Sequence, residues 1–146
     1  MLLPITLTAA GAAALLNIWL GLRVARVRGA HKVLIGDGGN PAVIARMRAH
    51  ANFTEYAPFF LILLGLIEMA AGSATWLWIA AIVFILARIL HAFGMDRPAL
   101  NPLRGIGIGL TLLTLLILAG YAIFIAYGAE REGGMTLVPV TQSAPR

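Results

Sequence analysis

The stretch Arg48-Ala49-His50-Ala51-Asn52-Phe53-Thr54-Glu55-Tyr56 leads without a break into an almost wholly apolar run. If the stretch is helical, Arg48, Asn52 and Glu55 lie within about 60° of one another, because each residue turns the helix by about 100°. Tyr56 extends the same stripe. Ionisable groups at a membrane are costly and usually face a cavity or a partner. The stripe therefore predicts a binding site at one end of a membrane-spanning helix.

The composition places the whole chain in a membrane. Of its 146 residues, 60% are hydrophobic and 12% are charged, whereas about a quarter of the residues in soluble domains are charged. The mean hydropathy is +0.90. The net charge of +5 comes from clustered Arg and Lys, which in so apolar a chain indicates membrane orientation and no binding to nucleic acid. The chain has no cysteine and therefore no disulfide or thiol nucleophile of its own.

Four apolar segments each approach the roughly 20 residues that cross a bilayer. They predict an all-α integral membrane protein whose four transmembrane helices form a left-handed bundle over residues 1–128, with helices at about 3–25, 41–71, 75–95 and 102–127. Residues 129–146 are expected to be a disordered tail. The first segment lacks a basic region before it and is followed by three more spans. It is therefore expected to be an anchor and not a cleaved signal peptide.

Two Asn-Pro pairs, Asn40-Pro41 and Asn101-Pro102, are typical of helix starts, with Asn as the N-cap. A helix over residues 41–71 would be about 46 Å long, which exceeds the roughly 30 Å of hydrocarbon in a bilayer. Its first turns, with the polar stripe, are therefore expected on the polar side. Pro58 is either a tolerated proline of a membrane helix or a functional bend.

Positive charge is distributed unevenly along the chain. Six basic residues lie between residues 23 and 48, three lie around the junction of the third and fourth spans, and two lie near the C-terminus. By the positive-inside rule, both basic loops are cytoplasmic and both termini lie outside. Arg46 and Arg97 are expected to lie among lipid headgroups.

The pattern Arg48-Ala49-x-x-Asn52-x-x-Glu55-Tyr56-x-Pro58 resembles the second-helix signature of the MAPEG family, the membrane-associated proteins in eicosanoid and glutathione metabolism. The run Gly36-Asp37-Gly38-Gly39-Asn40 is similar to the small bacterial branch, and Arg88-x-x-His91 resembles the third-helix motif. The resemblance covers nearly the whole chain, including the basic first loop and the short second turn. The chain looks like a small bacterial-type member that resembles the microsomal glutathione transferases.

The resemblance implies a homotrimer that binds glutathione, as a co-substrate, between subunits near the cytoplasmic face. It implies that Arg48, Asn52 and Glu55 hold the ends of the tripeptide and that Tyr56 lines the site. The chemistry agrees, because a guanidinium suits a carboxylate, a carboxylate suits an α-amino group, and an amide suits a peptide unit. A lipophilic substrate would enter from the bilayer, among the membrane lipids.

The family also has an Arg that faces the sulfur at the start of the fourth helix, and Arg104 takes that place here. A nearby cation lowers the pKa of a free thiol, which is about 8.5, and the positive end of a helix dipole adds to this effect. Alternatively, Arg104 anchors a helix end at phosphate headgroups. The same two alternatives, a role at the site or an anchor at the headgroups, apply to Arg88, which matches the third-helix Arg of the family.

Two further positions are expected at the site. Relatives that form leukotrienes or prostaglandins have tyrosines on the third helix where this chain has His91 and Met95, which argues against eicosanoid chemistry. His91 shares a helix face with Arg88 and would donate a hydrogen bond or take a proton, or it packs between helices. Relatives present a first-helix Arg to the neighbouring subunit, and Arg23 is preferred to Arg26 for that role.

Other features of the sequence are weaker evidence for a functional site. The motif Gly105-x-Gly107-x-Gly109 has no strand before it, so it predicts close helix contact and not a nucleotide loop. His31, His50 and His91 lack ligand-like spacing, and no metal site is expected. Glu68, near the outer end of the second helix, is expected to be hydrated.

The sequence therefore predicts a glutathione-dependent membrane transferase or peroxidase of the bacterial inner membrane, acting on hydrophobic electrophiles or lipid hydroperoxides. The competing hypothesis is a non-enzymatic scaffold that binds lipid or glutathione, since fold does not determine function. Arg104 favours the enzyme, and the absence of a third-helix tyrosine favours the scaffold. A transporter is a third hypothesis, but the chain shows no inverted repeat or pair of broken helices.

Overall fold

The computed structural model describes residues 2–97 and 101–133. Its helices are α1 (Pro4–Ala30), α2 (Pro41–Ala71), α3 (Thr75–Met95) and α4 (Pro102–Gly133). Each is long and apolar enough to cross a membrane. The predicted all-α membrane fold with four spanning helices is therefore confirmed.

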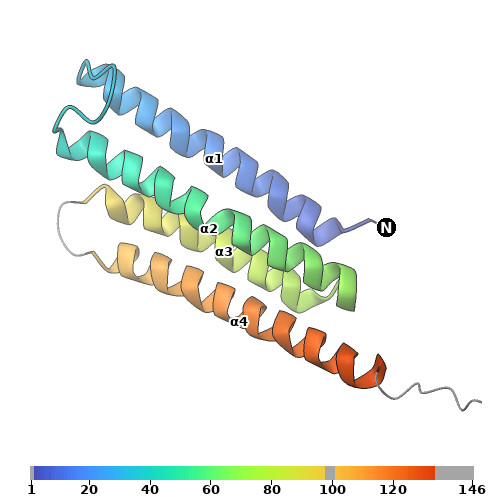
Figure 1. The fold of residues 1–146 in the computed structure, drawn as a ribbon. Helices are drawn as coiled ribbons and strands as arrows, with labels where there is room; N and C mark the ends of the chain where they lie inside the picture. The colour runs from blue at the N-terminus through green and yellow to red at the C-terminus, as the bar shows by residue number, and fades with distance from the viewer. Residues whose placement is uncertain (1, 98–100, 134–146) are drawn as a thin grey trace, which may run out of the picture.

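The helices run up and down in a bundle (Figure 1). The α1–α2 connection, the end of α3 and the start of α4 gather at one end, while the start of α1, the α2–α3 turn and the end of α4 lie at the other. We call the first of these the basic end, because Arg28 is in the last turn of α1, Lys32 follows that helix, and Arg104 is in the first turn of α4. Contacts are most extensive between α3 and α4 and between α1 and α2, and α1 also packs on α3 and α2 on α4.

Local capping explains where α2 and α4 begin. Asn40 Oδ1 accepts hydrogen bonds from the N–H groups of Ala42 and Val43 at 2.9 and 3.3 Å. Asn101 Oδ1 accepts one from the N–H of Leu103 at 2.9 Å. Each oxygen satisfies backbone donors that have no partner inside the helix. Both predicted N-caps are therefore confirmed.

Two helix ends differ from the expected bounds. Helix α1 continues to Ala30 instead of residue 25, and the chain leaves it through Lys32, which has a φ of 55°. Helix α4 continues to Gly133, so the tail expected from residue 129 starts inside a helix. Residues 134–146 lie outside the described part of the chain. Helix α2 continues through Pro58.

Glycines bring α3 and α4 into close contact. A Cβ on Gly107 would lie 2.6 Å from the backbone nitrogen of His91 and 2.7 Å from the carbonyl oxygen of Ala87. A Cβ on Gly94 of α3 would collide with the backbone of Arg104. The predicted role of the glycine motif in close helix contact is therefore confirmed at Gly107, whereas a Cβ on Gly105 or Gly109 would meet no neighbouring atom within 4 Å. These contacts also fix the first turn of α4 against the last turn of α3.

Glu68 is buried, so its expected hydration was wrong. Its side chain is 1% exposed and accepts hydrogen bonds from the N–H groups of Ile5 and Thr6 at 3.0 and 2.8 Å. It also accepts from the hydroxyls of Thr6 and Ser73, each at 2.7 Å. Leu3, at the N-cap position of α1, provides no side-chain cap. Glu68 of α2 therefore caps α1 from another helix, at the positive end of its dipole.

Candidate functional site

A polar pocket of about 230 Å³ opens between α2, α3 and α4 at the basic end. Six of the eight residues predicted for the site line it: Arg48, Asn52, Glu55, Tyr56, His91 and Arg104. Met95 and Ile108 complete much of the apolar wall. The pocket thus joins the stripe on α2 to the third-helix motif and to the start of α4.

The charged groups at the rim of the pocket are open to a ligand. Arg48, Glu55 and Arg104 are all exposed. Among the side chains that the structure describes, those of residues 2–97 and 101–129, the ion pairs both go to Asp96 and involve none of these three side chains. Two cations and one anion therefore face the pocket without an ion-pair partner in the described chain. This is a suitable arrangement for a zwitterionic ligand.

Arg88 lies beneath the pocket and not in its wall. Its side chain is 1% exposed. Its Nη2 donates to Asn52 Oδ1 at 2.6 Å, and its Nη1 donates to the hydroxyl of Thr111 at 3.3 Å. Its guanidinium carbon lies 5.8 Å from the centre of the Tyr56 ring. Arg88 therefore supports two residues that line the pocket.

The hydrogen bond from Arg88 determines what Asn52 offers to a ligand. A guanidinium only donates, so the atom of Asn52 that it contacts must be the amide oxygen. The amide nitrogen of Asn52, with its two N–H donors, is left for other partners. Because Asn52 lines the pocket, it offers donors suited to a carbonyl or carboxylate of the ligand.

The burial of Arg88 itself indicates a functional site. Its Nε is buried without a hydrogen-bond partner, and no carboxylate within the described residues forms an ion pair with it. A buried cation without a paired anion is costly. Such groups in membrane helices usually mark a binding or transport site.

His91 connects α3 to the start of α4. It is 5% exposed, and its Nδ1 lies 3.3 Å from the carbonyl oxygen of Arg104. Because a carbonyl only accepts, the proton in this contact belongs to Nδ1. Together with the close approach at Gly94, this contact holds the backbone of Arg104 beside the pocket.

Arg23 does not line the pocket of its own chain. It is 7% exposed, pairs with Asp96, and lies over the Trp19 ring at 4.6 Å. Arg46, expected among lipid headgroups, donates to the same carboxylate at 2.7 Å, so that expectation was incomplete. Arg26, the alternative to Arg23, is exposed on α1.

Asp96 was missed by the sequence analysis. It accepts from both Arg23 and Arg46 and so ties α1, α2 and the end of α3 together. The signal was present, because Asp96 is the one acidic residue in the strongly basic stretch from Arg88 to Arg104. No group of three His, Cys, Asp or Glu side chains that would suit a metal ion is found in the described part of the chain.

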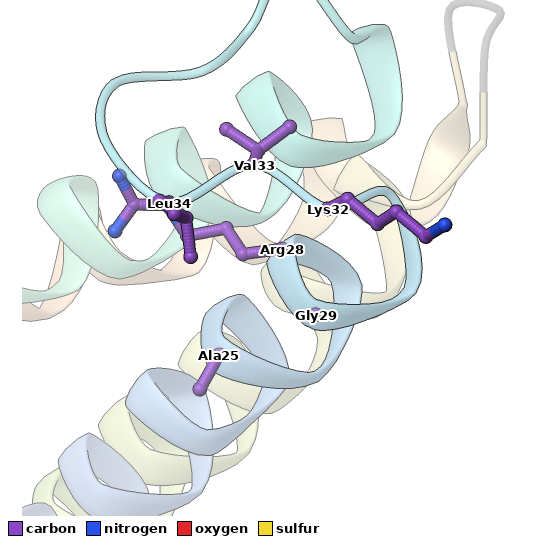
Figure 2. A pocket seen from close by; sticks show the side chains of 6 residues that line it. All are labelled: Ala25, Arg28, Gly29, Lys32, Val33 and Leu34. Carbon is purple, nitrogen blue, oxygen red and sulfur yellow. The ribbon is translucent and has the colours of Figure 1, made fainter.

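A larger hollow, of about 490 Å³, lies at the end of α1 and includes Arg28 and Lys32. Figure 2 shows that these two side chains point in opposite directions, so their charges do not converge. Arg28 also holds the connection to α2, because its Nε and Nη2 donate to the carbonyl oxygen of Gly36 at 3.2 and 2.6 Å. Despite its size, this hollow is therefore not the candidate site.

Four membrane-length helices with a charged pocket at one end define an integral membrane protein. The MAPEG family model matches residues 6–124, which include every residue of the pocket. The chain is 33% identical over 106 residues to the inner membrane protein YecN of Escherichia coli K12. The aligned residues make up 72% of this chain and 79% of YecN. YecN of Escherichia coli O6:H1 is also 33% identical to the chain over 106 residues. The chain belongs to the MAPEG family, the membrane proteins of eicosanoid and glutathione metabolism.

Proposed function

We propose that the protein binds glutathione in the pocket between α2, α3 and α4 and uses its sulfur on hydrophobic electrophiles or lipid hydroperoxides. The observation that carries the proposal is the pattern of unpaired charge around the pocket. Arg48 and Glu55 have opposite charges and their backbone positions lie about 10 Å apart along α2, with Asn52 between them. Glutathione has an α-amino group and two carboxylates, so it suits this pattern in both charge and extent.

Four of the pocket residues contact glutathione directly in the proposal. Glu55 accepts hydrogen bonds from the α-amino group, and Arg48 binds a carboxylate with its guanidinium fork. Asn52, oriented by Arg88, donates to a carbonyl of the peptide. Arg104 stabilises the thiolate, with help from the positive end of α4. The thiolate then forms a bond to the electrophilic carbon of the substrate. With a hydroperoxide, it attacks the outer oxygen and breaks the O–O bond, which gives an alcohol and the sulfenic acid of glutathione. A second glutathione converts the sulfenic acid to the disulfide and water.

The pocket of one chain encloses a ligand only in part, which supports a shared site. Its volume of about 230 Å³ is below the roughly 300–1,000 Å³ typical of small-molecule sites. Its charged residues lie at an exposed rim. We therefore propose a trimer in the inner membrane, with the basic end cytoplasmic and each pocket closed by the neighbouring subunit. Arg26 is exposed, whereas Arg23 is held by Asp96, so Arg26 is the better placed of the two to reach a neighbour.

Glu55→Gln is expected to weaken glutathione binding by about 1–3 kcal/mol, because it removes a charge-assisted hydrogen bond. Calorimetry on the purified protein measures the change. An analogue of glutathione without the α-amino group should bind the variant and the unchanged protein almost equally. Asp37→Asn, which removes one exposed negative charge away from the pocket, is the matched control and should bind normally. Equal losses for glutathione and the analogue would refute the pairing of Glu55 with the amine.

Chemical cross-linking in mild detergent is expected to stop at three chains, because a closed ring satisfies every copy of a shared site. Binding of glutathione should then require the assembled ring. A stable monomer that binds one glutathione per chain would contradict the shared site, while leaving the Glu55 test unaffected.

A further inference from the structure

A second candidate site lies in a groove between α1 and α3. We propose that this groove binds an acyl chain of an anionic phospholipid, whose phosphate lies at the cluster of Arg23, Arg46 and Asp96. The groove shares no lining residue with the polar pocket. The proposal is therefore independent of glutathione binding.

Two hollows in series form the groove. The one nearer the basic end, of about 460 Å³, is bounded by α1 between Ala12 and Trp19 and by α3 between Ile85 and Phe93. The other, of about 180 Å³, continues from it, and the two share Ala12 and Ile85. The first hollow is about 12 Å long along α3, close to half of the roughly 30 Å hydrocarbon layer. Its length therefore suits the acyl region of one leaflet.

The lining of the groove suits an alkyl chain. Small residues create it, with Ala9 and Ala12 on α1 facing Ala81 on α3. Apart from Thr8, its lining residues are apolar. A groove in the surface of a bundle loses dispersion contacts unless atoms of the surroundings fill it. In a membrane, those surroundings are acyl chains.

The end of the groove carries charge. Trp19 and Phe93 meet there edge to face, with ring centres 5.6 Å apart. The guanidinium carbon of Arg23 lies 4.6 and 5.6 Å from these two ring centres. Arg23 pairs with Asp96, which Arg46 also contacts, so two cations share one carboxylate and one positive charge remains uncompensated.

A phosphate supplies what this cluster lacks. It has a negative charge and several acceptor oxygens, and it suits guanidinium groups. Arg46, whose side chain is 30% exposed, is the cation of this cluster that is open to the phosphate. Arg23 directly follows the uncharged first span of the sequence, at the depth where headgroups begin. A helix of a second copy would leave the charge unbalanced, and a free phosphate would leave the groove empty, so a phospholipid is the occupant that satisfies both ends.

The test compares lipids with matched acyl chains on delipidated protein in detergent. Native mass spectrometry counts bound lipid, and thermal melting measures stabilisation. Phosphatidylglycerol is expected to bind roughly fivefold or more tightly than phosphatidylcholine, the scale of one cation near an anionic lipid surface, and to raise Tm. Soluble glycerol phosphate should bind only weakly and should not raise the Tm of the protein. Equal binding of the two lipids, or tight binding of glycerol phosphate, would overturn the proposal.

Variants locate the site. Ala12→Phe fills the point at which the two hollows meet and should abolish phosphatidylglycerol retention. Ala126→Phe places the same ring on an exposed position of α4 and should retain the lipid. Arg46→Gln, at a partly exposed side chain, should lose the preference for phosphatidylglycerol but still bind a chain. If Ala12→Phe does not fold, the headgroup preference of Arg46→Gln is sufficient to test the proposed phospholipid site. The proposed site is refuted if a folded Ala12→Phe still retains phosphatidylglycerol. It is also refuted if Arg46→Gln still prefers phosphatidylglycerol to phosphatidylcholine.

Discussion

Arg104→Leu is expected to abolish the thiolate absorbance of bound glutathione while leaving the affinity for its protonated thiol form almost unchanged. The ends of the tripeptide are held by α2 in the proposed complex, whereas Arg104 acts on the sulfur from α4. Ultraviolet difference spectra, recorded well below the free thiol pKa of about 8.5, measure the thiolate. Loss of one oriented cation should lower the rate of any catalysed conjugation by about a hundredfold or more, by analogy with oxyanion-stabilising donors.

The controls for Arg104 separate a local charge from a general one. Arg97→Leu removes an exposed cation from the same junction but outside the pocket, and it should keep the thiolate signal. Arg104→Lys should keep part of it. If the unchanged protein binds glutathione without lowering the thiol pKa, the enzyme hypothesis is wrong, and the non-enzymatic binding protein is the better account.

Glu68→Leu is expected to lower the free energy of unfolding by about 3–5 kcal/mol, because each buried donor left without an acceptor costs roughly 1–3 kcal/mol. Four donors lose their acceptor at once: the two N–H groups at the start of α1, and the hydroxyls of Thr6 and Ser73. Denaturant titration in detergent measures the loss. Hydrogen exchange should also become faster at the amides of Ile5 and Thr6, because these lose their cap.

Glu68→Gln provides the graded comparison, since one oxygen acceptor remains and the charge is lost. The free energy of unfolding of Glu68→Gln should lie between that of Glu68→Leu and that of the unchanged protein. A Glu68→Leu variant within about 0.5 kcal/mol of the unchanged protein, the range of ordinary surface substitutions, would show that the buried contacts do not stabilise the bundle.

Much of the fold could be predicted because its signals are local. An uncharged run of about 20 residues has few alternatives to a membrane helix, and an Asn followed by Pro is able to cap a helix without any distant partner. The stripe on α2 was equally readable, because helical spacing alone brings Arg48, Asn52 and Glu55 to one face. The bounds of α1 and α4 were less accurate, because both helices continue beyond their apolar runs into polar sequence.

The candidate site was predictable as a set of residues but not as an arrangement. Spacing cannot distinguish a residue in the wall of a pocket from one beneath it. Arg88 and Arg104 both appeared as third- and fourth-helix cations, yet Arg88 is buried under Asn52 while Arg104 is exposed at the rim. Arg23 appeared as a site residue, yet it pairs with Asp96. These differences depend on which helices are neighbours, which no single segment records.

The sequence by itself determined that this chain crosses a membrane with four helices, where α2 and α4 begin, and which residues of α2 share a polar face. Each of these follows from apolar length, capping or helical period within one segment. Only the tertiary structure decided that Glu68 caps α1, that Asp96 is shared by two arginines, and that Arg88 donates a hydrogen bond to the amide oxygen of Asn52. The physical reason is that a buried polar group must find its partner in space, and in this bundle the partners lie on other helices, far away in the chain.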